Sequence, residues 1–184
     1  MSTRRSQRVN GRRSSRRVGG DLCGIERRGR STGFTLVELL IVVSILLVIA
    51  ALAVPNFLRA RLAANEASAA SSCRSINTAE FTYNAFYAQG YSSTLAQLGP
   101  PTGGPPTSAA ADLIDQQLAS GQRSRYSFTY TPGDLVGAKY TTYQLQARPS
   151  VPQDTGTRYF FTDPSGVIRG NVGAPAGPSS FPIP

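Results

Sequence analysis

The longest hydrophobic run in the sequence lies between Gly33 and Pro55 and contains a single charged residue, Glu38. A helix rises ~1.5 Å per residue, so residues 34–54 would form a rod of ~30 Å, which matches the hydrocarbon thickness of a bilayer. Residues 34–54 are therefore predicted to form a helix that can span a membrane.

After Pro55, apolar residues become confined to one helical stripe. Proline removes a backbone donor and clashes with the preceding turn, so we expect a kink at Pro55 rather than the end of the helix. The stripe keeps steps of three, four or seven residues, with a polar interruption at Glu66. It comprises Leu58, Leu62, Ala69, Cys73, Ile76, Ala79, Tyr83 and Phe86. The two parts together predict one long helix from Phe34 to about Tyr87.

The pattern beyond this helix changes to the period of two that is typical of β-strands. A Gly- and Pro-rich loop at 99–106 precedes a short helix, which we expect over 109–120 with Ser108 as its cap. Three or four short antiparallel strands follow, predicted from residues 126–130, 143–147, 158–162 and 167–169. One face of this sheet is expected to pack on Ile76, Tyr83 and Phe86, which gives an α+β fold. Of residues 170–184, 7 of 15 are Gly or Pro, so this tail is expected to be extended and mobile.

Glu38 is the unusual residue of the hydrophobic run, because an ionised acid near the centre of a membrane helix costs up to a few kcal/mol. Its carboxylate needs a cationic partner. Cleavage between Gly33 and Phe34 would create an α-amino group about one helical turn from residue 38. The partner would be this new amine or the amine of another copy of the chain.

The sequence Gly33-Phe34-Thr35-Leu36-Val37-Glu38-Leu39-Leu40, followed by an apolar run that ends at Pro55, closely resembles the N-terminus of type IV prepilins and type II secretion pseudopilins. The resemblance implies that a membrane peptidase cuts after Gly33 and that Phe34 is then N-methylated. It implies a role for Phe34 and Glu38 in filament assembly, with Glu38 neutralising the amine of a neighbouring subunit. It also implies the pilin-like fold, a long helix kinked at Pro55 and packed on a small antiparallel sheet.

Two other interpretations of residues 34–54 are a plain membrane anchor and a secretory signal cut after Ala53. A plain anchor leaves the pattern Gly-Phe-Thr-Leu-Val-Glu unexplained. Secretory signals usually have an apolar region of ~7–15 residues, which is shorter than this run, and here the run also contains an acid. Both interpretations are therefore disfavoured.

The positive charge is concentrated before the hydrophobic run. The chain has a net charge of +9, of which residues 1–33, with ten Arg against Asp21 and Glu26, contribute +8. The remainder is close to neutral at +1, so the sequence gives no direct indication of nucleic-acid binding. Residues 1–33 are expected to be a disordered leader, which the positive-inside bias keeps in the cytoplasm before cleavage.

Several kinds of chemistry are disfavoured by composition. The chain has no His, which removes Ser-His-Asp and Cys-His catalysis and the commonest metal ligand. Of its two cysteines, Cys23 would leave with the leader, so Cys73 has no partner in the processed chain; we expect a buried, inert thiol rather than a reactive or intermolecular one. Calcium binding at Asp112 and Asp115 is a weaker alternative. We predict no catalytic residues, no metal and no cofactor.

The sequence thus predicts five segments: a cleaved leader at 1–33, a transmembrane and filament-core half-helix at 34–54, an amphipathic half-helix at 55–91, a head at 92–169 and a tail at 170–184. The predicted function is that of a non-enzymatic filament subunit, stored in the inner membrane and then assembled in the periplasm or at the cell surface. Its expected partners are a prepilin peptidase/N-methyltransferase, identical or related subunits, and a pilus or secretion assembly platform. The alternatives are the major pseudopilin of a type II secretion system and a membrane-anchored periplasmic binding or enzymatic domain.

Overall fold

The chain forms two compact units, residues 1–42 and 43–184, of which the computed structural model describes residues 33–183. Residues 1–32 of the predicted leader at 1–33, with Cys23, lie outside the described residues. The first unit contains the start of helix α1, Leu36–Tyr87, and the second contains the rest of that helix and the head. Helix α1 continues through Pro55, as predicted, and the side-chain amide of Asn56 donates to the carbonyl of Leu52 at 3.2 Å.

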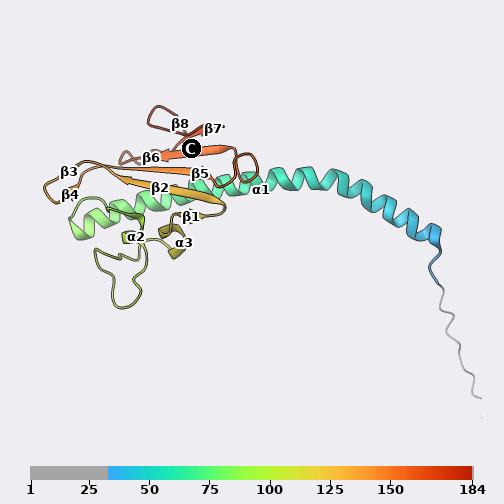
Figure 1. The fold of residues 1–184 in the computed structure, drawn as a ribbon, viewed down its shortest axis with the longest axis horizontal. Helices are drawn as coiled ribbons and strands as arrows, with labels where there is room; N and C mark the ends of the chain where they lie inside the picture. The colour runs from blue at the N-terminus through green and yellow to red at the C-terminus, as the bar shows by residue number, and fades with distance from the viewer. Residues whose placement is uncertain (1–32, 184) are drawn as a thin grey trace, which may run out of the picture. The chain divides into compact units, whose positions relative to one another are not determined.

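The head contains two short helices and a main sheet of six antiparallel strands (Figure 1). The helices are α2, Leu95–Leu98, and α3, Gln116–Ala119. The sheet has the order β1-β2-β5-β6-β7-β8. Its strands are β1 (Gln122–Arg123), β2 (Tyr126–Pro132), β5 (Tyr143–Pro149), β6 (Arg158–Thr162), β7 (Arg169–Val172) and β8 (Phe181–Pro182). A separate hairpin of β3 (Leu135–Val136) and β4 (Lys139–Tyr140) is inserted between β2 and β5.

The α+β class and the long helix packed on an antiparallel sheet are confirmed. The predicted strand segments correspond to β2, β5, β6 and β7, but the main sheet has six strands rather than three or four. The two additional strands, β1 and β8, have two residues each, too short for a period of two to be visible in the sequence. Strand β8 and most of β7 lie within the predicted tail at 170–184, so this stretch pairs with the sheet rather than forming a mobile tail.

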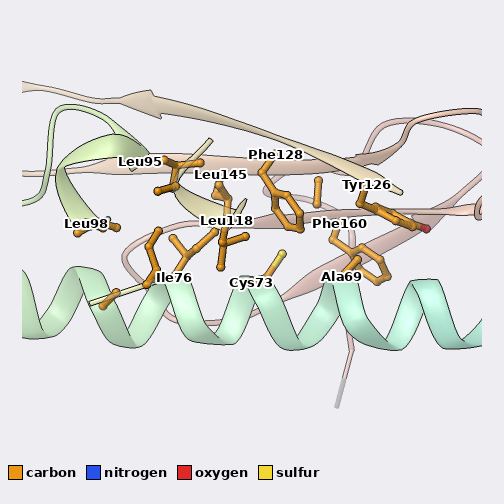
Figure 2. Packing of buried hydrophobic residues seen from close by; sticks show 14 of the residues in the cluster. Ala69, Cys73, Ile76, Leu95, Leu98, Leu118, Tyr126, Phe128, Leu145 and Phe160 are labelled. Atoms are coloured by element: carbon orange, nitrogen blue, oxygen red, sulfur yellow. The ribbon is translucent and has the colours of Figure 1, made fainter. Parts of the chain in front are cut away.

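The core lies between one face of α1 and the inner face of the sheet (Figure 2). Helix α1 contributes Ala69, Cys73 and Ile76, spaced so that they share a face. Alternation along the strands brings Phe128 of β2, opposite Ala147 of β5, to the same side. Other members of the cluster are Ala79, Tyr83, Leu95, Leu98, Leu118, Tyr126, Leu145 and Phe160.

Of the three α1 residues predicted to pack on the sheet, Phe86 is wrong. Ile76 and Tyr83 are buried as expected, but Phe86 is 82% exposed. The apolar face continues from Tyr83 to Tyr87 instead, a step of four rather than three, and Tyr87 packs against the core. Both steps are compatible with a helical stripe, so the sequence did not distinguish them.

The helix predicted over 109–120 is also wrong, because only Gln116–Ala119 is helical. The backbone amide of Ala111 donates to the carbonyl of Gln97, and that of Leu113 donates to the carbonyl of Leu98, at 2.8 Å each. Those amides therefore already have partners in the α2 region. The cap is Asp115, whose carboxylate accepts from the amide of Leu118, rather than Ser108.

Candidate functional site

The candidate site is the beginning of α1, where the predicted cleavage, methylation and assembly residues lie. Gly33, Phe34 and Thr35 precede the helix, and the first intrahelical hydrogen bond runs from the amide of Leu39 to the carbonyl of Thr35 at 3.2 Å. The hydroxyl of Thr35 accepts from the amide of Glu38 at 3.1 Å. Thr35 is therefore the N-cap, so the helix begins two residues after the expected Phe34.

The capping role of Thr35 was missed in the sequence, although a signal for it was present. Thr35 and Glu38 have the Thr-x-x-Glu spacing of a capping box, which marks the start of a helix. The carboxylate of Glu38 also lies in the first turn of α1, where the helix dipole favours negative charge. Glu38 thus has a local structural role in addition to the one that the resemblance implies.

Gly33 has no structural requirement for glycine within the part of the chain that the structure describes. A Cβ placed on Gly33 would meet no atom within 4 Å, and its φ is not in the left-handed region. Larger residues would therefore fit at this position as far as the described fold is concerned. A need for glycine at position 33 therefore does not come from the fold of residues 33–183.

Phe34 and Glu38 lie at the same end of α1, four residues apart, and both are exposed. The Glu38 carboxylate makes no hydrogen bond or ion pair with the residues that the structure describes. A cationic group from another chain, or a new amine on Phe34, could therefore approach it. Pro55 lies within the helix, outside this cluster, and its kink stays a prediction.

The apolar residues that follow are uncovered by any described part of the chain. The exposure of their side chains ranges from 45% for Val42 to 78% for Leu36. Burying one such side chain is worth ~1.5–3 kcal/mol, so the whole set corresponds to tens of kcal/mol. The set contains Phe34, Leu36, Val37, Leu39, Leu40, Ile41, Val42, Val43, Ile45, Leu46, Leu47, Val48, Ile49, Leu52, Val54, Phe57 and Leu58. This surface requires lipid or another protein, and α1 is long and apolar enough to cross a membrane.

Two acids of α1 have structural partners in the head that the sequence did not reveal. Glu66 accepts from the amide and hydroxyl of Thr157, at 2.7 and 2.8 Å, and lies 3.7 Å from the Arg158 guanidinium. Glu80 is fully buried and accepts from the amide and hydroxyl of Ser92, at 2.9 and 2.5 Å. Burial raises the pKa of Glu80, and the hydrogen bonds from Ser92 oppose that shift. These carboxylates hold loops onto α1.

The remaining candidate groups also have structural explanations. Cys73 is buried, and desolvation raises the pKa of its thiol to about 12, which disfavours the reactive thiolate. Asp115 caps α3 and pairs with Arg123, so its carboxylate is already used, while Asp112 is exposed. No group of three potential metal ligands occurs among residues 33–183.

Comparison with known proteins identifies the N-terminal segment. Residues 28–54 match the family model described as the prokaryotic N-terminal methylation motif, the signature of type IV prepilins and pseudopilins. This segment includes Gly33, Phe34, Glu38 and the apolar half of the helix up to Val54. No curated protein and no solved structure matches the chain. The match therefore concerns the N-terminal segment and does not extend to the head.

Proposed function

We propose that this chain is a structural subunit of a type IV pilus-like filament, made as a prepilin, cleaved after Gly33 and N-methylated on Phe34. One observation carries the proposal: the methylation motif at 28–54 includes the uncovered apolar half of α1, residues 36–54, in which Glu38 is the one charged side chain. A motif alone would fit any processed membrane anchor. The acid at position 38 gives the anchor a means of pairing with another subunit.

Assembly would transfer the apolar surface from lipid to neighbouring subunits. Before assembly, residues 34–54 span the inner membrane once, with the Arg-rich leader on the cytoplasmic side. Withdrawal into a filament buries the same side chains against other helices, so they need not be exposed to water. Glu38 fixes the register, since its carboxylate is best placed where it meets an N-terminal amine. The chain has a structural rather than catalytic role in this scheme.

The proposal also explains Gly33. Nothing in the described fold requires glycine there, whereas a peptidase that binds the residue before the cut closely would. The expected partners are therefore a prepilin peptidase/N-methyltransferase, identical or related subunits, and an assembly platform.

The second candidate is the major pseudopilin of a type II secretion system, because the matched motif is the signature of both groups. Deleting the gene and examining the cells distinguishes the two. Loss of surface filaments supports the pilus, and loss of a secreted enzyme with unchanged surface filaments supports the pseudopilin.

Mass spectrometry of the N-terminus tests the proposal against a membrane-anchored domain of another class. The full chain is expressed in cells that contain a prepilin peptidase, with Gly33→Ser as the matched variant. We expect an N-terminal peptide that begins with N-methyl-Phe34 in the wild type and an uncut chain in the variant. An N-terminus at Met1 in the wild type would indicate a plain anchor, and one at Val54 would indicate a secretory signal; either result would overturn the proposal.

A further inference from the structure

The face of the sheet that points away from α1 contains a hollow of about 590 Å³. Side chains alternate along a strand, so the neighbours of the inward-facing Ala147 and Phe160 point outward; these include Arg148 of β5 and Tyr159 of β6. The hollow is lined in part by Gln122, Ser127, Arg148, Pro152, Tyr159 and Pro175. Its volume is within the range of small-molecule sites, roughly 300–1,000 Å³, and a smaller hollow of about 90 Å³ shares Arg148, Tyr159 and Pro175.

One wall of this outer-face hollow is the loop between β5 and β6, which is fixed by internal hydrogen bonds. The buried hydroxyl of Thr155 accepts from the amide of Val151 at 3.1 Å and donates to its carbonyl at 3.0 Å. The amide of Ser150 donates to the carbonyl of Arg125 at 2.9 Å. Pro152 adds a fixed φ angle.

Pro175, in the loop after β7, also lines the hollow, and this loop is held in place too. The amide of Gly173 donates to the carbonyl of Thr157 at 2.9 Å, and the side chain of Asn171 donates to the carbonyl of Pro175 at 3.4 Å. Ala176 is buried and anchors the loop on the sheet. Two walls that are already ordered reduce the entropy that a ligand would have to overcome on binding.

Arg148 is the charged group of this hollow. Arg123 pairs with Asp115 and Arg158 pairs with Glu66, but the exposed guanidinium of Arg148 makes no hydrogen bond or ion pair within residues 33–183. A guanidinium presents parallel N–H donors that match the two oxygens of a carboxylate. The hollow is therefore equipped to bind an anionic group at one end.

We propose that the outer-face hollow binds a carboxylate-bearing sugar of an acidic oligosaccharide. Arg148 would bind the carboxylate, the side chains of Gln122 and Ser127 would bind ring hydroxyls, and Tyr159 with the two prolines would pack against the C–H faces of the sugar. A single unpaired cation suits one carboxylate, whereas nucleic-acid binding depends on neutralising several phosphates. The proposal does not depend on filament formation.

Titration of the full-length protein in zwitterionic detergent micelles with trigalacturonic acid, followed by calorimetry, tests this site. We expect saturable binding, and a loss of roughly tenfold or more in affinity for Arg148→Gln, because a charge-assisted pair is removed. Lys139→Gln on β4 is the matched control, since it removes the same charge from an exposed position outside the hollow. The control is expected to bind as the wild type does.

A second variant tests the hollow itself without changing the charge. Ser127→Tyr introduces a ring on the floor of the hollow, at a strand position where Tyr is well accepted. It should abolish binding while the far-ultraviolet circular dichroism spectrum stays unchanged. Equal losses in Arg148→Gln and Lys139→Gln would show nonspecific charge attraction. That result, an absence of binding in the wild type, or equally strong binding of uncharged trigalactose would each overturn the proposal.

Discussion

The two parts of α1 show how one helix is built for two different surroundings. From Leu36 to Leu58 its side chains are mostly large and aliphatic, they occupy all sides of the helix, and they are exposed. From Ala69 to Tyr83 the buried side chains are mainly small and form one stripe beneath the sheet. A helix that is apolar all round suits lipid or a bundle of helices, whereas a narrow stripe suits a single packed layer.

Each part also contains an acid, and the two acids have opposite environments. Glu38 is exposed in the apolar part, and its carboxylate has no partner among the described residues. Glu80, in the second part of α1, is buried and is bound by Ser92. The first acid is available to another molecule, while the second serves the fold of its own chain. The following variants test this difference.

The largest effect is expected for Glu38→Gln, which removes the charge with little change in size. Filament yield, measured by immunoblot of the sheared surface fraction and by electron microscopy, should fall at least tenfold, which corresponds to ~1.4 kcal/mol or more in an assembly equilibrium. Membrane insertion and cleavage should be unchanged. Asp112→Asn removes an exposed charge from the head and serves as the control. A normal filament yield in Glu38→Gln would refute the pairing role.

The next effect compares the same substitution in the two parts of α1. Ile76 is fully buried and Ile49 is 58% exposed, so Ile76→Ala should lower the free energy of unfolding of the head by ~2–5 kcal/mol, and Ile49→Ala by less than ~0.5 kcal/mol. Both are measured by chemical denaturation in detergent micelles. Similar values for the two variants would mean that the apolar half already has a partner within the chain.

A smaller effect is expected for Asn77→Ala in the buried polar network. The amide of Asn77 donates to the hydroxyl of Thr162 at 2.8 Å, and its oxygen accepts from the hydroxyl of Tyr143 at 3.0 Å. The substitution leaves these groups unsatisfied, which should cost ~1–3 kcal/mol of unfolding free energy. Asn56→Ala, at an exposed position of α1, should have little effect. Equal losses in the two variants would contradict the role of the network.

The smallest effect concerns Glu80→Gln and its dependence on pH. Burial raises the pKa of Glu80 in the folded head above its ordinary value of 4.5. Below pH 4.5 the Glu80 carboxyl is protonated in both the folded and the unfolded chain, so its burial causes no pH-dependent loss of stability there. As the pH rises, the Glu80 carboxyl loses its proton in the unfolded chain before it does so in the folded head, so the head becomes less stable. This loss ends once the pH passes the pKa of Glu80 in the folded head. Gln does not titrate and can still accept from Ser92.

The difference in melting temperature between Glu80→Gln and the wild type should therefore shift in favour of Gln as the pH rises from about 4.5 to about 7.5. Asp134→Asn, at an exposed position, is the control and should show no such shift. If the difference in melting temperature between Glu80→Gln and the wild type does not depend on pH, Glu80 is ionised in the folded head throughout this pH range.

The sequence by itself determined the features that depend on neighbouring residues. The apolar run at 34–54, its acid at 38, the continuation of the helix through Pro55 and the alternation in β2 and β5 are all local patterns. Each can be predicted directly from helix length, charge or strand period. The turn at 163–166 is also local, and its Gly166 amide donates to the carbonyl of Asp163 at 3.0 Å.

Only the tertiary structure decided which distant groups meet. The pairing of Glu66 with Thr157, and of Asn77 with Thr162, joins residues 91 and 85 positions apart. The position of the sheet decides that Tyr87, rather than Phe86, packs against the core. The sheet also includes β8, close to the end of the chain, which pairs with β7. Such contacts follow from the register of the strands against α1, which local periodicity does not contain.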